Sequence, residues 1–202
     1  MKIAILDAGN IGGTLGKKWQ AAGHEVIFGV RESHSAKTRA ALENAGGKIR
    51  AVDVDEALRF GQIILVSIPY GAVPELLAAH TAGMENKTIL DATNNFGGPV
   101  INNLERIREK VPSAALYRAF NSLGWEIFAN PQIGGLQADM FYSGPEGPQR
   151  PVVEGLIAEI GVRPSWVGDN DRAAIVDSMG ALWVTLVRER GRSRRIAIKL
   201  IE

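Results

Sequence analysis

Apolar and polar positions along this chain alternate in blocks that predict strands and helices following one another. Short apolar runs bounded by turn residues, such as residues 63–67, are typical of strands buried in a parallel sheet. Longer segments with apolar residues three or four apart, such as residues 11–22, predict helices. The predicted strands are residues 2–6, 24–28, 48–52, 63–67, 88–90, 114–120, 139–144 and 162–167, and the predicted helices are residues 11–22, 35–45, 53–59, 74–79, 103–110, 150–160 and 171–188.

This alternation predicts an α/β fold of the Rossmann type, a doubly wound parallel sheet with helices on both faces. We expect it to span residues 1–136. The pattern then changes, which predicts a small C-terminal domain over residues 137–202, an α/β or helical extension on the substrate side with possible dimer contacts. Ligands of such sheets bind at the carboxyl ends of the strands. The polar loops there, residues 91–98 among them, should therefore face one site.

The last predicted helix carries an apolar stripe, and a basic tail follows it. The stripe could pack against the sheet, or it could form a dimer interface or cover the substrate. We favour packing against the sheet, although these roles can coexist. A basic run is usually a solvated face, and contact with a polyanionic substrate is the alternative. The stripe consists of Ile175, Met179, Leu182, Trp183 and Leu186, and the tail contains Arg188, Arg190, Arg192, Arg194, Arg195 and Lys199.

The first strand stops at a glycine-rich turn that opens the first helix. Gly9 and Gly12 occupy the second and third glycine positions of the dinucleotide motif G-x-G-x-x-G, and Asp7 stands at the first. Unpaired N–H groups and the dipole at a helix start favour an anion, and glycines let a pyrophosphate approach the backbone. Asp tolerates the backbone angles of the turn, although its carboxylate must then point away from the phosphates. The predicted contacts are Ala8, Gly9, Asn10, Ile11 and Gly12.

The end of the second predicted strand indicates which dinucleotide binds. Proteins that prefer NAD usually place Asp or Glu about 20 residues beyond the glycines, where it binds the ribose 2′-hydroxyl. This chain has Val30 and Arg31 there, and the donors of an Arg suit a 2′-phosphate, which favours NADP. Alternatively, Arg31 is an exposed charge neutralised by Glu32, or Glu32 itself takes the ribose. Further contacts could come from Ser33, His34, Ser35 and Lys37.

Composition and charge narrow the classes of function. A formal net charge of +1 argues against nucleic acid as a partner. The absence of Cys excludes disulfides, thiolate metal sites and a cysteine nucleophile, and the three His residues lack the spacing of metal ligands, so we expect no metal. No apolar run approaches the roughly 18 residues of a membrane span, and no signal peptide pattern opens the chain. We therefore expect a cytoplasmic protein with no membrane partner.

Blocks of residues along nearly the whole chain, in order and at suitable spacing, resemble the family of coenzyme F420-dependent NADP oxidoreductases. The resemblance implies a Rossmann domain followed by a small C-terminal domain, usually in a homodimer, with hydride exchanged between NADP and the 5-deazaflavin F420. The blocks are residues 9–13, 23–26, 29–31, 67–69, 91–94 and 119–124.

The same resemblance implies roles for particular residues. Arg31 would hold the 2′-phosphate, and Asn94 would lie near the nicotinamide ribose. Asn121, in the last block, is a further candidate for cofactor binding. Ser67, Ile68 and Pro69 would flank the adenosine and its ribose. The chain departs from the family at three positions, where the family has a usual Gly, a frequent phosphate-binding Ser and a common Pro; here these are Asp7, Val30 and Asn95.

The predicted chemistry needs little from the protein. Hydride transfer to a deazaflavin requires two rings in contact but no protein acid or base, so we expect no catalytic side chain. Reduction of a carbonyl or imine would need a proton donor, for which Tyr70, Tyr142 and His80 are candidates. Three hypotheses stay open: an F420-type NADP oxidoreductase, an NADPH-dependent reductase of another flavin, quinone, imine or carbonyl compound, and a non-catalytic NADP-binding redox module. The expected partner is a small-molecule electron donor or acceptor.

Overall fold

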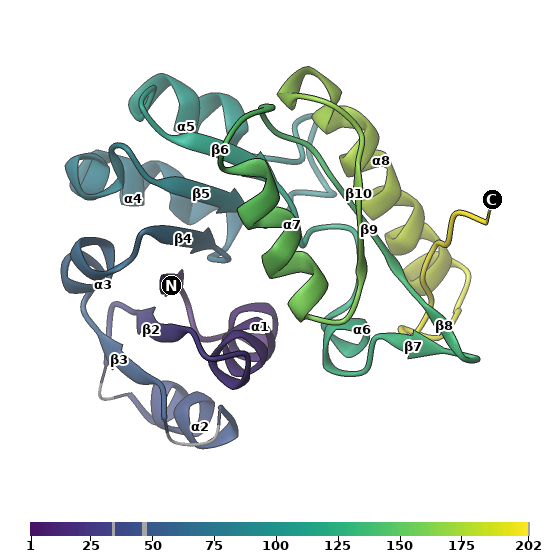
Figure 1. Cartoon of the computed structure of the whole chain (residues 1–202), viewed down its shortest axis with the longest axis horizontal. Coiled ribbons are helices and arrows are strands. Elements are labelled where there is room, and N and C mark those ends of the chain that lie inside the picture. Colours follow the sequence, from purple (N-terminus) through teal and green to yellow (C-terminus); the bar gives the residue numbers. More distant parts are fainter. Residues whose placement is uncertain (34, 46–47, 202) are drawn as a thin grey trace.

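The computed structural model describes residues 1–33, 35–45 and 48–201, and its largest feature is a parallel sheet of six strands in the order β3-β2-β1-β4-β5-β6. Strand order reverses between β1 and β4, as in a doubly wound sheet, so the predicted Rossmann-type fold is confirmed (Figure 1). The strands are β1 (Lys2–Leu6), β2 (Glu25–Gly29), β3 (Arg50–Val52), β4 (Ile63–Val66), β5 (Thr88–Asp91) and β6 (Ala115–Arg118).

Helices cover both faces of this sheet because its strands are apolar on both sides. Ile3 and Ile5 face one side, where they share a core with Trp19 of the first helix. Leu6 and Ile64 face the other side and pack with residues of the third, fourth and fifth helices. These helices are α1 (Asn10–Ala21), α2 (Ala36–Asn44), α3 (Val54–Phe60), α4 (Val73–His80) and α5 (Leu104–Lys110).

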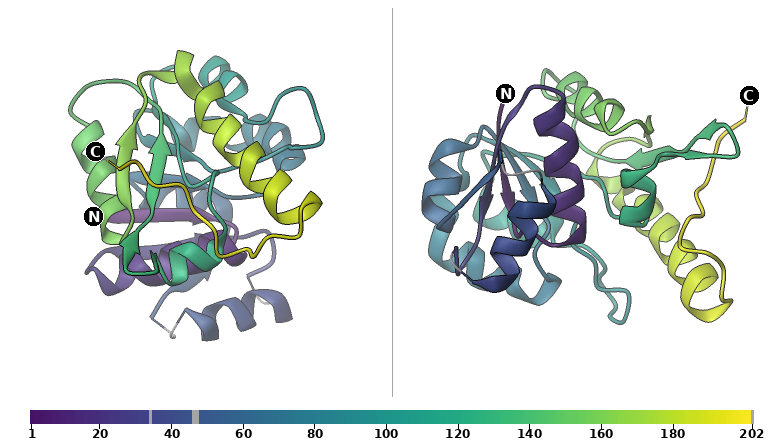
Figure 2. Two further views of the ribbon diagram at one scale, coloured as in Figure 1. Left: turned by 90° about the vertical axis from the view of Figure 1, so that its right-hand side faces the viewer. Right: turned by 90° about the horizontal axis from the view of Figure 1, so that it is seen from below.

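The rest of the chain forms a second layer beside the sheet. Strands β9 (Asp139–Tyr142) and β10 (Arg163–Trp166) pair in parallel, and an antiparallel bridge between Arg118 and Ser143 joins them to β6. The right-hand view of Figure 2 shows the last helix and a short hairpin projecting away from the six strands. The remaining elements are α6 (Trp125–Ala129), the hairpin strands β7 (Gln132–Ile133) and β8 (Leu136–Gln137), α7 (Arg150–Glu159) and α8 (Ala173–Val184).

Sequence reasoning missed α6 and the hairpin. The hairpin turns at Gly134 and Gly135, whose φ angles of 59° and 80° suit a two-residue turn that favours glycine. This Gly-Gly pair was a readable signal. The predicted helix 171–188 is also divided, because a 3-10 turn precedes α8 and a π-helical turn, Thr185–Glu189, follows it.

One continuous core crosses the boundary predicted at residue 136. Met140 and Tyr142 belong to the same buried cluster as Ile3 and Ile5. The Trp19 indole N–H of α1 donates to the Leu156 carbonyl of α7 at 2.9 Å. The division into two domains stays a prediction, and the two parts share their packing.

Our preferred interpretation of the apolar stripe on the last helix is wrong for two of its residues. Ile175 and Leu182 are 45% and 42% exposed. The buried face of α8 consists instead of Ala173, Val176, Asp177 and Gly180. Small residues and one carboxylate let this helix lie close to the loops beneath it, which leaves the larger apolar side chains outside.

Across the three described ranges, no helix combines the length and the apolar character needed to cross a lipid bilayer.

Candidate cofactor site

The glycine turn leaves the start of α1 open to an anion. Asp7 adopts a φ of 83°, and its N–H donates to the Gly29 carbonyl at 3.1 Å, so the turn forms although Asp replaces the first glycine. Gly9 is the N-cap of α1, and in the part of the chain that the structure describes no side chain caps this helix. No acidic residue lies in the first turn either. The backbone N–H groups there are oriented as a phosphate would require.

Gly12 brings α1 into close contact with β1 and with the end of β4. A Cβ at this position would lie 2.5 Å from the Asp7 carbonyl and 2.9 Å from Ser67 Oγ. The Ser67 hydroxyl donates to the Leu6 carbonyl at 2.9 Å and so braces the same turn. Both features agree with the roles of the third motif glycine and of the strand end beside it.

Adjoining cavities surround the turn and collect most of the predicted contacts. Val30 and Arg31 line both a cavity of about 410 Å³ and a neighbouring one of about 290 Å³. Ala8 borders the first, Ile68 and Pro69 border the second, and Gly9 and Asn10 border a third beside α1. Arg31 is exposed, so its guanidinium is accessible to a ligand. Ile11 and Ser33 are partly buried and line none of these cavities.

Two carboxylates also belong to this site. Asp7 lines the first two cavities, and its Oδ2 lies 2.7 Å from the position that a Gly9 Cβ would take, so the carboxylate lies against the turn. Glu32 lines the same cavity as Arg31, which leaves both alternatives for Glu32 open.

The segment after Glu32 contributes the start of α2. Ser35 caps this helix, because its Oγ accepts from the Thr38 N–H at 3.1 Å, and both residues line the 410 Å³ cavity. The predicted contacts from His34 and from the Lys37 side chain fall outside the described part of the chain.

Asn94 and Asn121 form a separate cluster at the carboxyl ends of β5 and β6. The Asn94 Nδ2 donates to the Asn121 carbonyl at 3.1 Å, and the Asn94 Oδ1 accepts from Arg118 at 2.7 Å. Arg118 is fully buried and also pairs with Asp91 and Asp177. The structure thus brings together the two amides that sequence reasoning named, and it adds charged residues that this reasoning missed.

Two of these missed residues, Arg118 and Asp177, left a signal in the sequence. Arg118 interrupts the apolar run of a predicted strand, and Asp177 stands within the apolar pattern of the last helix. Charged residues are almost never fully buried unless they are paired, so a charge in such a position predicts a partner elsewhere in the fold. Periodicity could not reveal which residue that partner is.

Two of the three candidate proton donors are bonded to carboxylates, and the third has an arginine stacked on its ring. The Tyr142 hydroxyl donates to Glu154 at 2.5 Å, and burial, reinforced by this carboxylate, raises its pKa well above the usual range. His80 Nδ1 lies 2.6 Å from Asp55. The guanidinium of Arg106 lies over the Tyr70 ring, 4.9 Å from its centroid.

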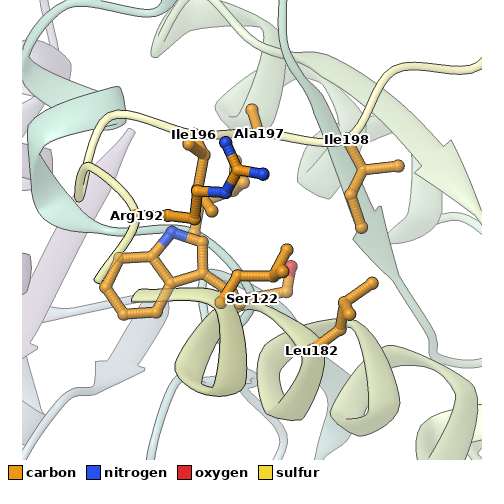
Figure 3. A pocket seen from close by; sticks show the side chains of 9 residues that line it. Ser122, Leu182, Arg192, Ile196, Ala197 and Ile198 are labelled. Carbon is orange, nitrogen blue, oxygen red and sulfur yellow. The ribbon is translucent and has the colours of Figure 1, made fainter. Parts of the chain in front are cut away.

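An apolar cavity of about 270 Å³ lies next to the Asn121 segment. Ser122 and Leu123 line it from one side, α8 from another, and the C-terminal segment closes it (Figure 3). Trp183 belongs to this lining, and its buried Nε1 has no hydrogen-bond partner among the described residues. Arg192 adds a positive charge. The other lining residues are Leu182, Leu186, Ile196, Ala197 and Ile198.

All five arginines of the C-terminal basic tail are exposed, as expected of a solvated face, but three basic residues of the tail also contact the rest of the chain. Arg194 pairs with Glu126 and lies over the Trp183 ring, 5.1 Å from its centroid. Arg195 donates to the Gln132 carbonyl at 3.1 Å, and Lys199 to Asp139 at 3.2 Å. These contacts fix the segment that closes the apolar cavity.

Residues 2–95 match the family model described as NADP oxidoreductase, coenzyme F420-dependent. The resemblance predicted from the sequence is confirmed over this segment. The matched segment includes the glycine turn, Arg31 and Asn94, and it ends before Arg118 and Asn121. It supports an NADP-dependent oxidoreductase.

Solved structures with low sequence identity share the fold. A proposed F420-dependent NADP reductase from Arthrobacter sp. FB24 is 20% identical, with a TM-score of 0.88 and full coverage of both chains. A hypothetical protein from Sinorhizobium meliloti is 24% identical, with a TM-score of 0.70 and coverage of 84% of this chain and 85% of that one. A reductive aminase from Aspergillus terreus, solved with NADPH, is 21% identical, with a TM-score of 0.66 and coverage of 96% and 68%. No curated protein matches the chain.

Proposed function

We propose that this protein transfers a hydride between NADP(H) and a deazaflavin acceptor of the coenzyme F420 type. The observation that carries the proposal is the uncapped start of α1 beside the Gly9 turn, with Arg31 on the wall of the adjoining cavities. A pyrophosphate would accept from the backbone N–H groups of that helix end, and a 2′-phosphate would accept from the guanidinium. The family description over residues 2–95 supports the same cofactor.

The protein would contribute orientation and exclusion of water rather than an acid or a base. When bound, NADPH supplies the hydride, and the transfer needs the two reacting carbons about 3–3.5 Å apart. Asn94 and Asn121 lie at the carboxyl ends of β5 and β6, where such sheets bind the reactive end of a ligand. Since two of the three candidate donors, Tyr142 and His80, are bonded to carboxylates, reduction of a carbonyl is the less favoured alternative.

The apolar cavity beside Ser122 is our candidate for the acceptor site. Its aliphatic walls would hold a flat apolar ring, the Trp183 N–H would donate to a ring oxygen, and Arg192 would attract an anionic group. Ala197→Trp should fill the cavity, raise KM for F420 and leave the Kd of NADPH unchanged. Ala174→Trp, which adds the same bulk to an exposed position of α8, should change neither constant.

The function is tested by mixing the pure protein with NADPH and oxidised F420. We expect the deazaflavin absorbance to fall with time, and no loss of absorbance would refute the acceptor. A panel of flavins, quinones, imines and carbonyl compounds run beside it identifies a different reductase if one of them turns over while F420 is inert. Binding of NADP without turnover of any acceptor would identify a non-catalytic redox module.

We also propose that two copies of the chain associate through the exposed apolar face of α8. Ile175 and Leu182 are both exposed, and they lie on the same face of the helix because they are seven positions, about two turns, apart. The same face on a second copy could pack against them in a symmetric dimer. Ile175→Glu should shift the protein from dimer to monomer in sedimentation. Leu136→Glu, which alters another exposed leucine in the β7–β8 hairpin, should not. A monomeric wild type would refute the proposal.

A further inference from the structure

A fully buried arginine joins three separate segments of the chain at the carboxyl end of the sheet. Arg118, the last residue of β6, is 0% exposed. Its Nε donates to Asp177 Oδ1 of α8 at 2.9 Å, and its Nη1 donates to the Thr93 carbonyl at 2.6 Å and lies 3.3 Å from Asp91 Oδ2. One guanidinium therefore holds two carboxylates that are themselves buried, one from the sheet and one from the C-terminal helix.

The same contacts close a ring that contains both amides of the candidate cofactor site. Arg118 Nη2 donates to Asn94 Oδ1 at 2.7 Å, and Asn94 Nδ2 donates to the Asn121 carbonyl at 3.1 Å. Asn121 Nδ2 donates in turn to Asp177 Oδ1 at 3.3 Å. Each amide is bound at one end by this charged pair, Asn94 by the guanidinium and Asn121 by the carboxylate of Asp177, and the two amides are linked to each other. The positions of both amides are thus set from α8.

Two further observations mark this ring as more than a structural anchor. Asn121 Oδ1 is buried and, within the described residues, has no hydrogen-bond partner, so an acceptor is available for a donor that the chain does not supply. Helix α8 also lies directly on the site, because a Cβ on Gly180 would be 3.1 Å from the Asn121 carbonyl and 2.9 Å from the Phe96 ring. A hydroxyl or amide of the nicotinamide riboside half of the cofactor has the donor that Asn121 lacks.

We infer that Asp177 is a positioning residue that holds Asn94 and Asn121 for the nicotinamide half of the cofactor. The inference rests on the proposed NADP binding and assigns to the C-terminal helix a part in it. Asp177 acts through Arg118 and Asn121, because its carboxylate accepts hydrogen bonds from these two neighbours. It also accepts from Asn102, whose Nδ2 lies 2.6 Å from Asp177 Oδ2. Its removal should disturb one half of the cofactor site and leave the glycine turn intact.

The test compares two nucleotides that share the adenosine 2′-phosphate end. NADPH contains the nicotinamide, whereas adenosine 2′,5′-bisphosphate lacks it. In Asp177→Asn, which keeps the size of the side chain and removes its charge, we expect the Kd of NADPH to rise about tenfold, because bonds to a charged group are lost. The Kd of adenosine 2′,5′-bisphosphate should change less than about twofold. Asp177→Glu, which restores the carboxylate, should recover part of the NADPH affinity.

Asp139→Asn is the matched control. Asp139 is a buried carboxylate of the C-terminal part as well, but its partners are Arg163, Lys199 and the Leu200 N–H. This variant should lose stability without changing the ratio of the two dissociation constants. If Asp177→Asn does not fold, Asn102→Ala carries the test, since it removes one bond to Asp177, together with the bond from the Leu104 N–H, and should raise that ratio to a smaller extent.

If Asp177→Asn weakens the binding of both nucleotides equally, or changes the binding of neither, the positioning role is overturned. The proposed reaction can fail separately. If the wild type binds both nucleotides but does not reduce F420, the proposed acceptor is refuted and the positioning role of Asp177 is not. A wild type that binds neither nucleotide refutes both.

Discussion

The glycine turn and the Arg118 ring, which we propose as the two ends of one cofactor site, are built in opposite ways. The turn uses residues close in sequence, leaves backbone donors open and places its cation, Arg31, at an exposed position. The ring uses residues from β5, β6 and α8, pairs nearly every polar atom and buries its cation completely. Phosphate recognition can therefore depend on neighbouring residues alone, whereas the position of the opposite end depends on tertiary packing.

Removal of the buried cation should cause the largest effect. In Arg118→Leu, Asp91 and Asp177 keep hydrogen bonds from neutral neighbours but stay buried without their cationic partner, so the free energy of unfolding should fall by about 3–5 kcal/mol. Denaturation in urea measures the loss. Arg163→Leu is the control, because Arg163 is partly exposed and its partner Asp139 keeps bonds from Lys199 and Leu200. A loss in Arg118→Leu no larger than in Arg163→Leu would contradict the network.

A bulky residue at Gly12 should damage the other end of the site. The added atoms of Gly12→Val would collide with the Asp7 carbonyl and with Ile5, which cannot move without displacing β1. We expect a loss of stability of about 1–3 kcal/mol and no measurable binding of NADPH. In Gly13→Ala, the new Cβ would lie 3.5 Å from the Ala8 carbonyl, an ordinary contact, so stability should be retained. Thermal unfolding and calorimetric titration distinguish the two variants.

Arg31→Ala tests the exposed cation without disturbing the fold. Loss of bonds from a guanidinium to a phosphate should weaken NADPH by about 10–100-fold, whereas NADH, which has no 2′-phosphate, should be nearly unaffected. Titration with both cofactors gives the ratio. Arg50→Ala is the control, because Arg50 pairs with Glu56 and does not line the cavities. Equal losses for NADPH and NADH would refute the role of Arg31.

The smallest effect concerns Asp139, the buried carboxylate outside the site. Burial by itself would raise its pKa, but the bonds from Arg163, Leu200 and Lys199 outweigh burial and hold the pKa below the ordinary value of 3.8. The folded state therefore favours the charged form, so this stabilisation is complete above the ordinary value and is lost as the pH falls further. The difference in Tm between wild type and Asp139→Asn should be constant near neutral pH and shrink below about pH 4. A difference that grows with acid would contradict the sign.

Most of the fold was predictable because it depends on short-range patterns. Fully apolar strands and helices with one buried face identified the elements of the sheet within a few residues. The second layer was harder, because α6 is only five residues long and the β7–β8 hairpin is held by a turn rather than by a hydrophobic pattern. The prediction that the stripe of α8 packs against the sheet was wrong for a related reason. Periodicity identifies an apolar face but not what covers it.

The sequence by itself determined the strand, turn and helix that present open N–H groups at Gly9, since a glycine turn and a helix start are properties of neighbouring residues. Only the tertiary structure decided that Arg118, Asp177, Asn94 and Asn121 share one buried ring. A charged side chain is stable in the low-dielectric interior only when it is paired, and here its partners come from distant segments of the chain. Which distant segments lie together is decided by packing.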